Sequence, residues 1–395
     1  MKYIRIIILA ITLSFCVNFT VGQAVKPYLQ KVLANNPWIQ QAKQQMEAER
    51  SSQLTGITPP GPELEAGYFP GKDNVVKRTF GVSQRFEMPM VYSRKLKNAR
   101  SKQEISKAVY QQRMMDILLE ASKKAIQYRY THNVLEVLES RKQHAMELLA
   151  AFEKSLEQGD ANLLEVNKIR VAQLNVIERL AYHKQKLASL KAEIRQFVNG
   201  ESVDFEKIKY PEPFVLSRNE YVNLGLQSSP NILQIKQQLK TDSIAVKLTK
   251  AQNWPSFKVG YEYEAADPEQ FSGIKAGISI PLWQNSKKTK TARARVMASS
   301  ARNDAIISSL KTQLVSTYNE YRQVTETHQQ YSKTMNELDS FELLKKSLDF
   351  GHISLIEYLL ELKFFYEAND RLLELAYEQA LLNAELRRFE YMNLQ

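Results

Sequence analysis

Two long stretches without proline restrict what this sequence can fold into. Residues 282–395 contain no proline and a single glycine, Gly351. Residues 90–210 also lack proline, and before residue 200 their only glycine is Gly159. Proline breaks helices, whereas one glycine permits a sharp reversal between two of them. Each stretch therefore predicts a long helical hairpin with its tip at the glycine and with arms of about 100 Å.

The two hairpins belong to two copies of one unit. The tip glycines are 192 residues apart, and the same offset relates Pro89 to Pro281 and Glu165 to Glu357. Unrelated landmarks that share one register indicate a tandem duplication. We predict a signal peptide at residues 1–22, a first repeat at 23–200, a linker at 201–216 and a second repeat at 217–395.

The N-terminal segment has the features of a targeting sequence. Lys2 and Arg5 flank the start of an apolar run over residues 6–17. Cys16 is the only cysteine, and because Phe15 before it departs from a lipoprotein signal, we do not expect lipidation. No later stretch reaches 18 consecutive apolar residues, so a membrane crossing by the rest of the chain requires strands.

Composition and motifs argue against two broad classes of function. Lys and Arg outnumber Asp and Glu by 54 to 43, but they are spread along the helices among carboxylates, which argues against nucleic-acid binding. The five histidines are dispersed, and no metal-binding histidine pair, nucleophile elbow or phosphate loop occurs. We therefore expect no enzyme activity, no cofactor and no metal site.

Each copy places a shorter helix and two strands before the long hairpin. The shorter helices are expected at residues 25–54 and 218–252, with breaks at Asn36-Pro37 and Ser229-Pro230. Apolar and polar side chains alternate along residues 257–264 and 274–280, with a turn at 265–270. The first copy alternates less regularly, over residues 63–68 and 80–87, around a loop at 70–77.

Four strands with one apolar face leave two interpretations open. They form a sheet packed on the helices of a soluble protein, or they cross a membrane. Transmembrane barrels need at least about eight strands because open edges are not stable in lipid. The membrane interpretation therefore requires several copies of the chain.

At this point the sequence resembles the TolC family of bacterial outer membrane efflux proteins over essentially the whole chain after the signal peptide. The matching features are the helix starts at Asn36-Pro37 and Ser229-Pro230, the strand pairs that end at Pro89 and Pro281, and the glycine-tipped hairpins. The resemblance implies a mainly α fold with a membrane β-barrel portion. It implies a homotrimer whose protomers each contribute four strands to a twelve-stranded barrel in outer membrane lipid, with long α-helical coiled-coil hairpins forming a periplasmic tunnel.

The resemblance also implies partners and cargo. A periplasmic adaptor protein and an inner membrane pump, of the resistance-nodulation-division type, would deliver small molecules or metal cations to this duct. Residues 61–65 and 82–87 are similar to the heavy-metal efflux branch of the family. From the residues themselves, the only sign of cation transport is carboxylates such as Glu262 and Glu264, with lysines alternating nearby.

The resemblance assigns roles to residues at the hairpin tips. Glu357 and its copy Glu165, each six residues past a tip glycine, match an acidic tunnel constriction. The family often has a second acid three residues later, where this chain has Leu360, and the nearest carboxylate is Glu361. The residues expected to contact the adaptor are Gly159, Asp160, Leu163, Gly351, His352, Ser354 and Leu355. The plainer interpretation of Glu357 is a solvated helix residue.

A structural coiled-coil protein of the periplasm or cell surface is the alternative from a different functional class. It accounts for the long helices and their charged faces. It does not predict two segments of alternating apolar and polar residues, one in each copy. Extraction from the membrane only by detergent, as opposed to release by osmotic shock, separates the two interpretations.

Overall fold

The computed structural model describes residues 25–71, 76–283, 286–337 and 340–394. The predicted signal peptide and Cys16 lie outside these residues. Within them, no helix is both long enough and apolar enough to cross a membrane.

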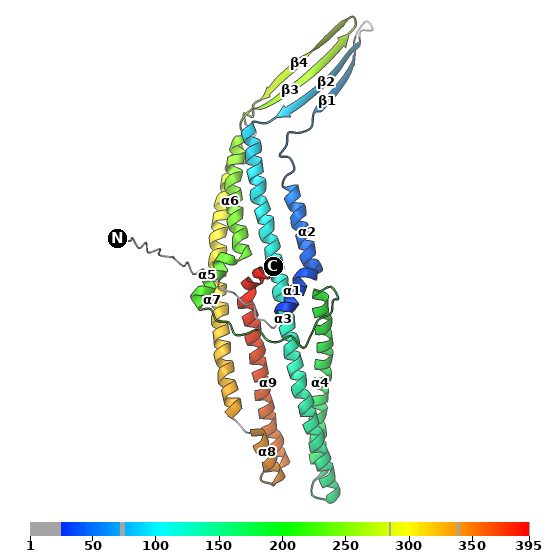
Figure 1. Ribbon diagram of the computed structural model, residues 1–395, viewed down its shortest axis with the longest axis vertical. Helices are drawn as coiled ribbons and strands as arrows, with labels where there is room; N and C mark the ends of the chain where they lie inside the picture. The colour runs from blue at the N-terminus through cyan, green and yellow to red at the C-terminus, as the bar shows by residue number, and fades with distance from the viewer. Residues whose placement is uncertain (1–24, 72–75, 284–285, 338–339, 395) are drawn as a thin grey trace, which may run out of the picture.

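The same order of elements occurs twice along the chain (Figure 1). The first half contains α1 (Lys26–Asn35), α2 (Pro37–Ser52), β1 (Glu63–Pro70), β2 (Val76–Phe86), α3 (Pro89–Gln158) and α4 (Leu163–Phe197). The second half contains α5 (Arg218–Ser228), α6 (Pro230–Ala251), β3 (Ser256–Ala266), β4 (Glu269–Ser279), α7 (Ser286–Glu337), α8 (Ser340–Asp349) and α9 (Leu355–Leu386). A 3-10 helix, η2 (Arg387–Asn393), follows α9.

Two expected boundaries differ from the structure. The turn predicted at residues 265–270 is shorter, because β3 continues to Ala266 and β4 begins at Glu269. Backbone pairing of Ala265 with Gln270 and of Ala266 with Glu269 extends the ladder through polar residues that carry no alternating signal. The loop predicted at residues 70–77 is also shorter, because Pro70 still belongs to β1 and β2 begins at Val76.

The four strands form one antiparallel sheet in the order β1-β2-β3-β4. The central pair, β2 with β3, joins the two halves of the chain, and its register places Phe80 opposite Tyr263. The sheet extends away from one end of the helices (Figure 1), and no described strand packs substantially on a helix. Its apolar face is therefore exposed, as Leu64 (70% exposed) and Ile274 (83%) illustrate. The expected alternative of a sheet packed on helices is wrong for the described residues.

The core lies between the helices. One cluster of buried side chains joins α1, α3 and α4 and includes Leu29, Leu118 and Ile194. A second joins α5, α7 and the end of α9, with Tyr221 and Leu314 near its centre. Burial of aliphatic and aromatic side chains at about 25 cal/mol per Å² stabilises these contacts. The helices thus form a long body that holds the sheet at one end and the hairpin tips at the other (Figure 1).

Asn36 links the start of α2 to the end of α4. Its side-chain oxygen accepts hydrogen bonds from the backbone N–H groups of Trp38 (3.0 Å) and Ile39 (3.2 Å). Its amide nitrogen donates to the Phe197 carbonyl (2.9 Å), which lies at the end of α4, where carbonyls have no helical partner. The Asn36 side chain is only 1% exposed.

We predict that Asn36→Ala lowers the free energy of unfolding by about 2–3 kcal/mol, because it removes an N-cap and leaves a buried carbonyl without a donor. Ser217, the N-cap of α5, is exposed and caps only its own helix, so Ser217→Ala should cost about 1 kcal/mol. Chemical denaturation followed by circular dichroism measures both. Equal losses in the two variants would show that the bond to α4 contributes nothing.

Candidate functional site at the hairpin tips and on the sheet

Both helical hairpins turn through a glycine in the left-handed conformation, which other residues rarely adopt. Gly159 and Gly351 have φ angles of +85° and +69°. In the first tip the Asp160 N–H donates to the Ser155 carbonyl (2.9 Å), and the bond at the same relative position in the second tip is 2.8 Å. The two tips therefore share one turn geometry, and they lie at the same end of the molecule (Figure 1).

The two glutamates expected at the constriction take part in helix caps. The Asn162 side chain accepts from the Glu165 N–H (3.0 Å), and the Glu165 carboxylate accepts from the Asn162 N–H (2.9 Å). Ser354 and Glu357 form the same reciprocal pair, in which the Glu357 carboxylate also accepts from the Ser354 hydroxyl (2.8 Å). Asn162 and Ser354 are thus the N-caps of the returning helices α4 and α9. These capping boxes give both glutamates a local role in the turn.

The cap also fixes the charge of Glu357. Hydrogen bonds from the Ser354 backbone N–H and hydroxyl lower the pKa of Glu357 below its usual value. A lowered pKa means that the carboxylate stabilises the cap above the ordinary pKa of glutamate and loses this effect as the pH falls through the lowered value. Glu361 is exposed and forms no ion pair with any described residue, and Leu360 is 52% exposed.

The apolar side chains at the two tips differ in exposure. Leu163 is 59% exposed, but Leu355 is 3% exposed and packs in a cluster with Ile169. Of the two leucines expected to contact an adaptor, only Leu163 therefore lies on the surface. At the second tip the exposed apolar side chains are Phe350 (73%) and Ile356 (54%), which the sequence analysis missed. Asp160, His352 and Ser354 are exposed, as expected of tip residues.

An ionic junction above the tips joins the two hairpins. The Asp370 carboxylate on α9 contacts Arg141 of α3 (2.7 Å) and Arg179 of α4 (2.9 Å). Arg141 is 4% exposed, and its guanidinium lies 4.2 Å from the centre of the Tyr366 ring. Burial by itself would raise the pKa of Asp370, but the hydrogen bonds and charges of the two arginines lower it below its usual value. Its three charged residues lie far apart in the sequence, and no local pattern marks them.

A histidine lies close to the junction. His144 of α3 hydrogen-bonds through its two ring nitrogens to the hydroxyls of Tyr358 (2.9 Å) and Tyr366 (3.1 Å), both on α9. Burial lowers the pKa of His144, which favours the neutral ring. These contacts tie α3 to α9 and use both ring nitrogens.

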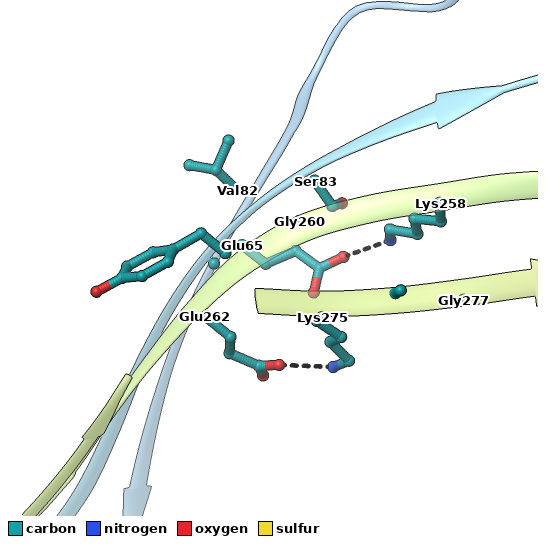
Figure 2. A pocket seen from close by; sticks show the side chains of 11 residues that line it. Glu65, Val82, Ser83, Lys258, Gly260, Glu262, Lys275 and Gly277 are labelled. Carbon is teal, nitrogen blue, oxygen red and sulfur yellow. Dashed lines mark hydrogen bonds and ion pairs between the residues drawn. The ribbon is translucent and has the colours of Figure 1, made fainter. Parts of the chain in front are cut away.

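The polar face of the sheet carries a ladder of ion pairs (Figure 2). Lys258 contacts Glu63 (2.9 Å) and Glu65 (3.4 Å), two strands away, and Lys275 contacts Glu262 (2.7 Å). Lys77 contacts Glu264 at 2.8 Å. The carboxylates that the sequence suggested as a sign of cation transport, Glu262 and Glu264, are therefore each neutralised by a lysine.

A glycine allows β2 and β3 to approach closely beneath this ladder. A Cβ atom on Gly260 would lie 2.6 Å from the Val82 carbonyl oxygen and 2.9 Å from the Ser83 Cβ. Figure 2 shows Gly260 beside Ser83, with Val82 pointing to the opposite face. Because backbone atoms cannot move away cheaply, a side chain at this position would distort the pairing.

We predict that Asp370→Asn destabilises the junction by about 2 kcal/mol, less than the 3–5 kcal/mol for a fully buried pair because Asp370 is half-buried. Amide hydrogen exchange near residue 370 should accelerate by about 30-fold at neutral pH. In the unchanged protein this protection should weaken as the pH falls through the lowered pKa of Asp370.

The control for this variant is Glu374→Gln. Glu374 contacts Arg371 at 3.0 Å on the exposed surface of the same helix, and its loss should change exchange very little. Equal exchange rates in the two variants would contradict a stabilising junction.

Comparison with known proteins identifies the architecture. No protein-family model and no curated protein matches the sequence. Among solved structures, CusC has a TM-score of 0.71 and 14% identity over 93% of this chain and 92% of its own. The Campylobacter jejuni CmeC outer membrane channel has a TM-score of 0.71 and 13% identity over 94% and 86%. The Neisseria gonorrhoeae MtrE outer membrane channel in its open state has a TM-score of 0.70 and 13% identity over 95% and 92%. The chain therefore has the fold of the TolC-type outer membrane channels.

Proposed function

We propose that three copies of this chain form an outer membrane channel of a tripartite efflux system. The observation that carries the proposal is the sheet. Its apolar face is covered by no described helix, and no described strand pairs with the outer edge of β1 or of β4. Unpaired backbone groups cost several kcal/mol each in lipid, so the edges must pair with other copies if the sheet enters a membrane.

Three copies satisfy this requirement in the simplest way that the fold allows. Pairing β4 of one copy with β1 of the next would give a closed barrel of about twelve strands, within the range of outer membrane barrels. The apolar side chains would then face lipid, and the ion-pair ladder of Lys258 and Lys275 would face the lumen. The long helices of the three copies would form a tunnel through the periplasm.

The hairpin tips are the part of this duct that would meet a periplasmic adaptor. Leu163, Phe350 and Ile356 supply exposed apolar side chains there, next to the polar Asp160 and His352. An inner membrane pump, of the resistance-nodulation-division type, would supply energy and cargo through that adaptor. The similar protein CusC undergoes conformational changes that accompany folding and transmembrane channel formation, which fits a duct of this kind.

The cargo we propose is small molecules or metal cations. Because lysines neutralise Glu262 and Glu264, we assign no cation preference to the sheet. Any acidic constriction would lie near the tips, where Glu357, Glu165 and Glu361 would form rings in a trimer. Rings of carboxylates concentrate cations and exclude anions.

The channel itself is tested on protein extracted from the outer membrane in detergent. We expect a particle of three 45.6 kDa chains and discrete conductance steps in planar bilayers. Protein released by osmotic shock as single chains, without conductance, would instead support the alternative of a structural coiled-coil protein.

We predict that Glu357→Gln raises anion conductance relative to cation conductance, because glutamine removes the charge but still fits the capping box. Ser354→Ala is the matched control, since it weakens the cap and keeps the carboxylate, and it should leave ion selectivity unchanged. Glu165→Gln and Glu361→Gln test whether further rings contribute. Unchanged selectivity in Glu357→Gln would remove Glu357 from the constriction.

A further inference from the structure

The helices that carry the sheet are strongly basic where they meet it. The first turns of α3, residues 89–102, and of α7, residues 286–302, contain several lysines and arginines and no acidic residue. The last turns of α6 add Lys247 and Lys250. This end of the helical body therefore has a large excess of positive charge.

The lysines of α6 lie on one side of the helix layer. Thr241 hydrogen-bonds to α3 and Asp242 to α7, which fixes two sides of α6. Two surface grooves, one toward α7 and one toward α2 and α3, meet at Gln252 just after α6 and open on the side of α6 between these two contacts. Lys247 and Lys250 are exposed and line neither groove, so they occupy the remaining side of α6.

The neighbouring helices repeat this arrangement. On α3, Lys95 and Lys102 line a groove, whereas Lys97 and Arg100 are exposed and do not. On α7, Lys290 and Arg293 are likewise exposed and lie outside the groove that α6 and α7 share. We define these six side chains as the basic collar: Lys97, Arg100, Lys247, Lys250, Lys290 and Arg293.

One ion pair shows which side of the helices lies next to which face of the sheet. Glu87 comes directly after β2, which ends at Phe86, and lies two residues past Arg85 of the polar face. Its carboxylate contacts Lys95 at 2.5 Å, on the groove side of α3. The groove side of the helices is therefore continuous with the polar face of the sheet, and the collar is continuous with the apolar face.

The collar differs from the solvated faces farther along the same bundle. There, basic side chains are interspersed with carboxylates of the same chain, and some pair with them, as Lys184 does with Glu139 (2.7 Å) and Arg170 with Glu153 (2.8 Å). None of the six collar side chains forms an ion pair with a described residue. Six exposed cations without carboxylate partners indicate a surface suited to anions.

The side chains around the collar indicate which anions it would bind. Trp254 (55% exposed) and Trp283 (77%) lie between the helices and the apolar strands, together with the exposed Ile280. Tryptophan favours the boundary between hydrocarbon and water, and basic side chains just beyond it attract anionic lipids. Lys250 lies one residue from the end of α6, and Lys97 and Arg100 lie within about 20 Å of the start of α3, close to where headgroups would be.

We infer that the basic collar binds the anionic phospholipid headgroups of the leaflet that borders the helices. This inference rests on the proposed function, because it requires the sheet to cross that membrane. The collar fixes the depth of the sheet in the membrane. Its Lys and Arg side chains contact lipid phosphates at the boundary between the apolar strands and the helices.

The test uses the full-length trimer reconstituted in phosphatidylcholine vesicles that contain brominated phosphatidylglycerol or brominated phosphatidylcholine. Bromine quenches nearby tryptophans, so Trp254 and Trp283 report which lipid borders the collar, and Trp38, in α2, is replaced by Phe to remove its signal. We expect the wild-type collar to favour phosphatidylglycerol. The Lys247→Gln, Lys250→Gln, Lys290→Gln triple variant should lose about fivefold in the ratio of the two affinities for each lysine removed, because each basic residue near the surface contributes about 1 kcal/mol.

A matched triple variant, Lys154→Gln, Lys345→Gln, Lys346→Gln, removes the same charge from exposed lysines at the opposite end of the molecule. It should keep the preference, whereas high salt should weaken the preference in the wild type. An unchanged ratio in the collar variant, or an equal loss in the matched variant, would overturn the inference. A protein that conducts in bilayers without lipid preference refutes only the collar, whereas one that never inserts refutes the proposed channel.

Discussion

Unpaired backbone groups at the two edges of a bare four-stranded sheet are the constraint on which the rest of the structure depends. In the part of the chain that the structure describes, no strand pairs with either edge and no helix covers the apolar face. In water such a sheet would associate with other copies, and in lipid it must close. The long helices hold this sheet at one end of the molecule (Figure 1). Closing the sheet by assembly would therefore also bring the helices of different copies together.

The two halves of the chain form matching turns at their tips, but the exposure of the side chains around the two tips differs. The two tips share the same glycine turn and a capping box, because these features involve residues close together in sequence. The surroundings of the tips differ. Leu355 is buried and Leu163 is exposed, although each begins the helix after its tip. Any partner that meets both tips would therefore contact two different apolar surfaces.

Charged side chains are distributed unevenly along the molecule. Those on the sheet, between the hairpins and near the tips have different partners and therefore different roles. On the polar face of the sheet, lysines neutralise the carboxylates, so that face carries little excess charge from these pairs. Between the hairpins, Asp370 is shared by two arginines and holds three helices together. Near the tips, the capped Glu357 remains ionised and exposed. An acidic side chain there therefore stabilises the turn and still keeps its charge at the surface.

The sequence by itself determined the elements of this protein. Prolines at helix starts, single glycines at the tips and alternation along the strands act through neighbouring residues, and they located the helices, four strands and two capped turns. It did not determine the strand ends near Ala266, because pairing with the opposite strand supports residues that have no pattern of their own. Only the tertiary structure decided that Arg141 and Arg179 share Asp370, that lysines neutralise Glu262 and Glu264, and that Leu355 is buried. These contacts join residues far apart in the chain, and their free energy depends on burial and distance, which local sequence does not fix.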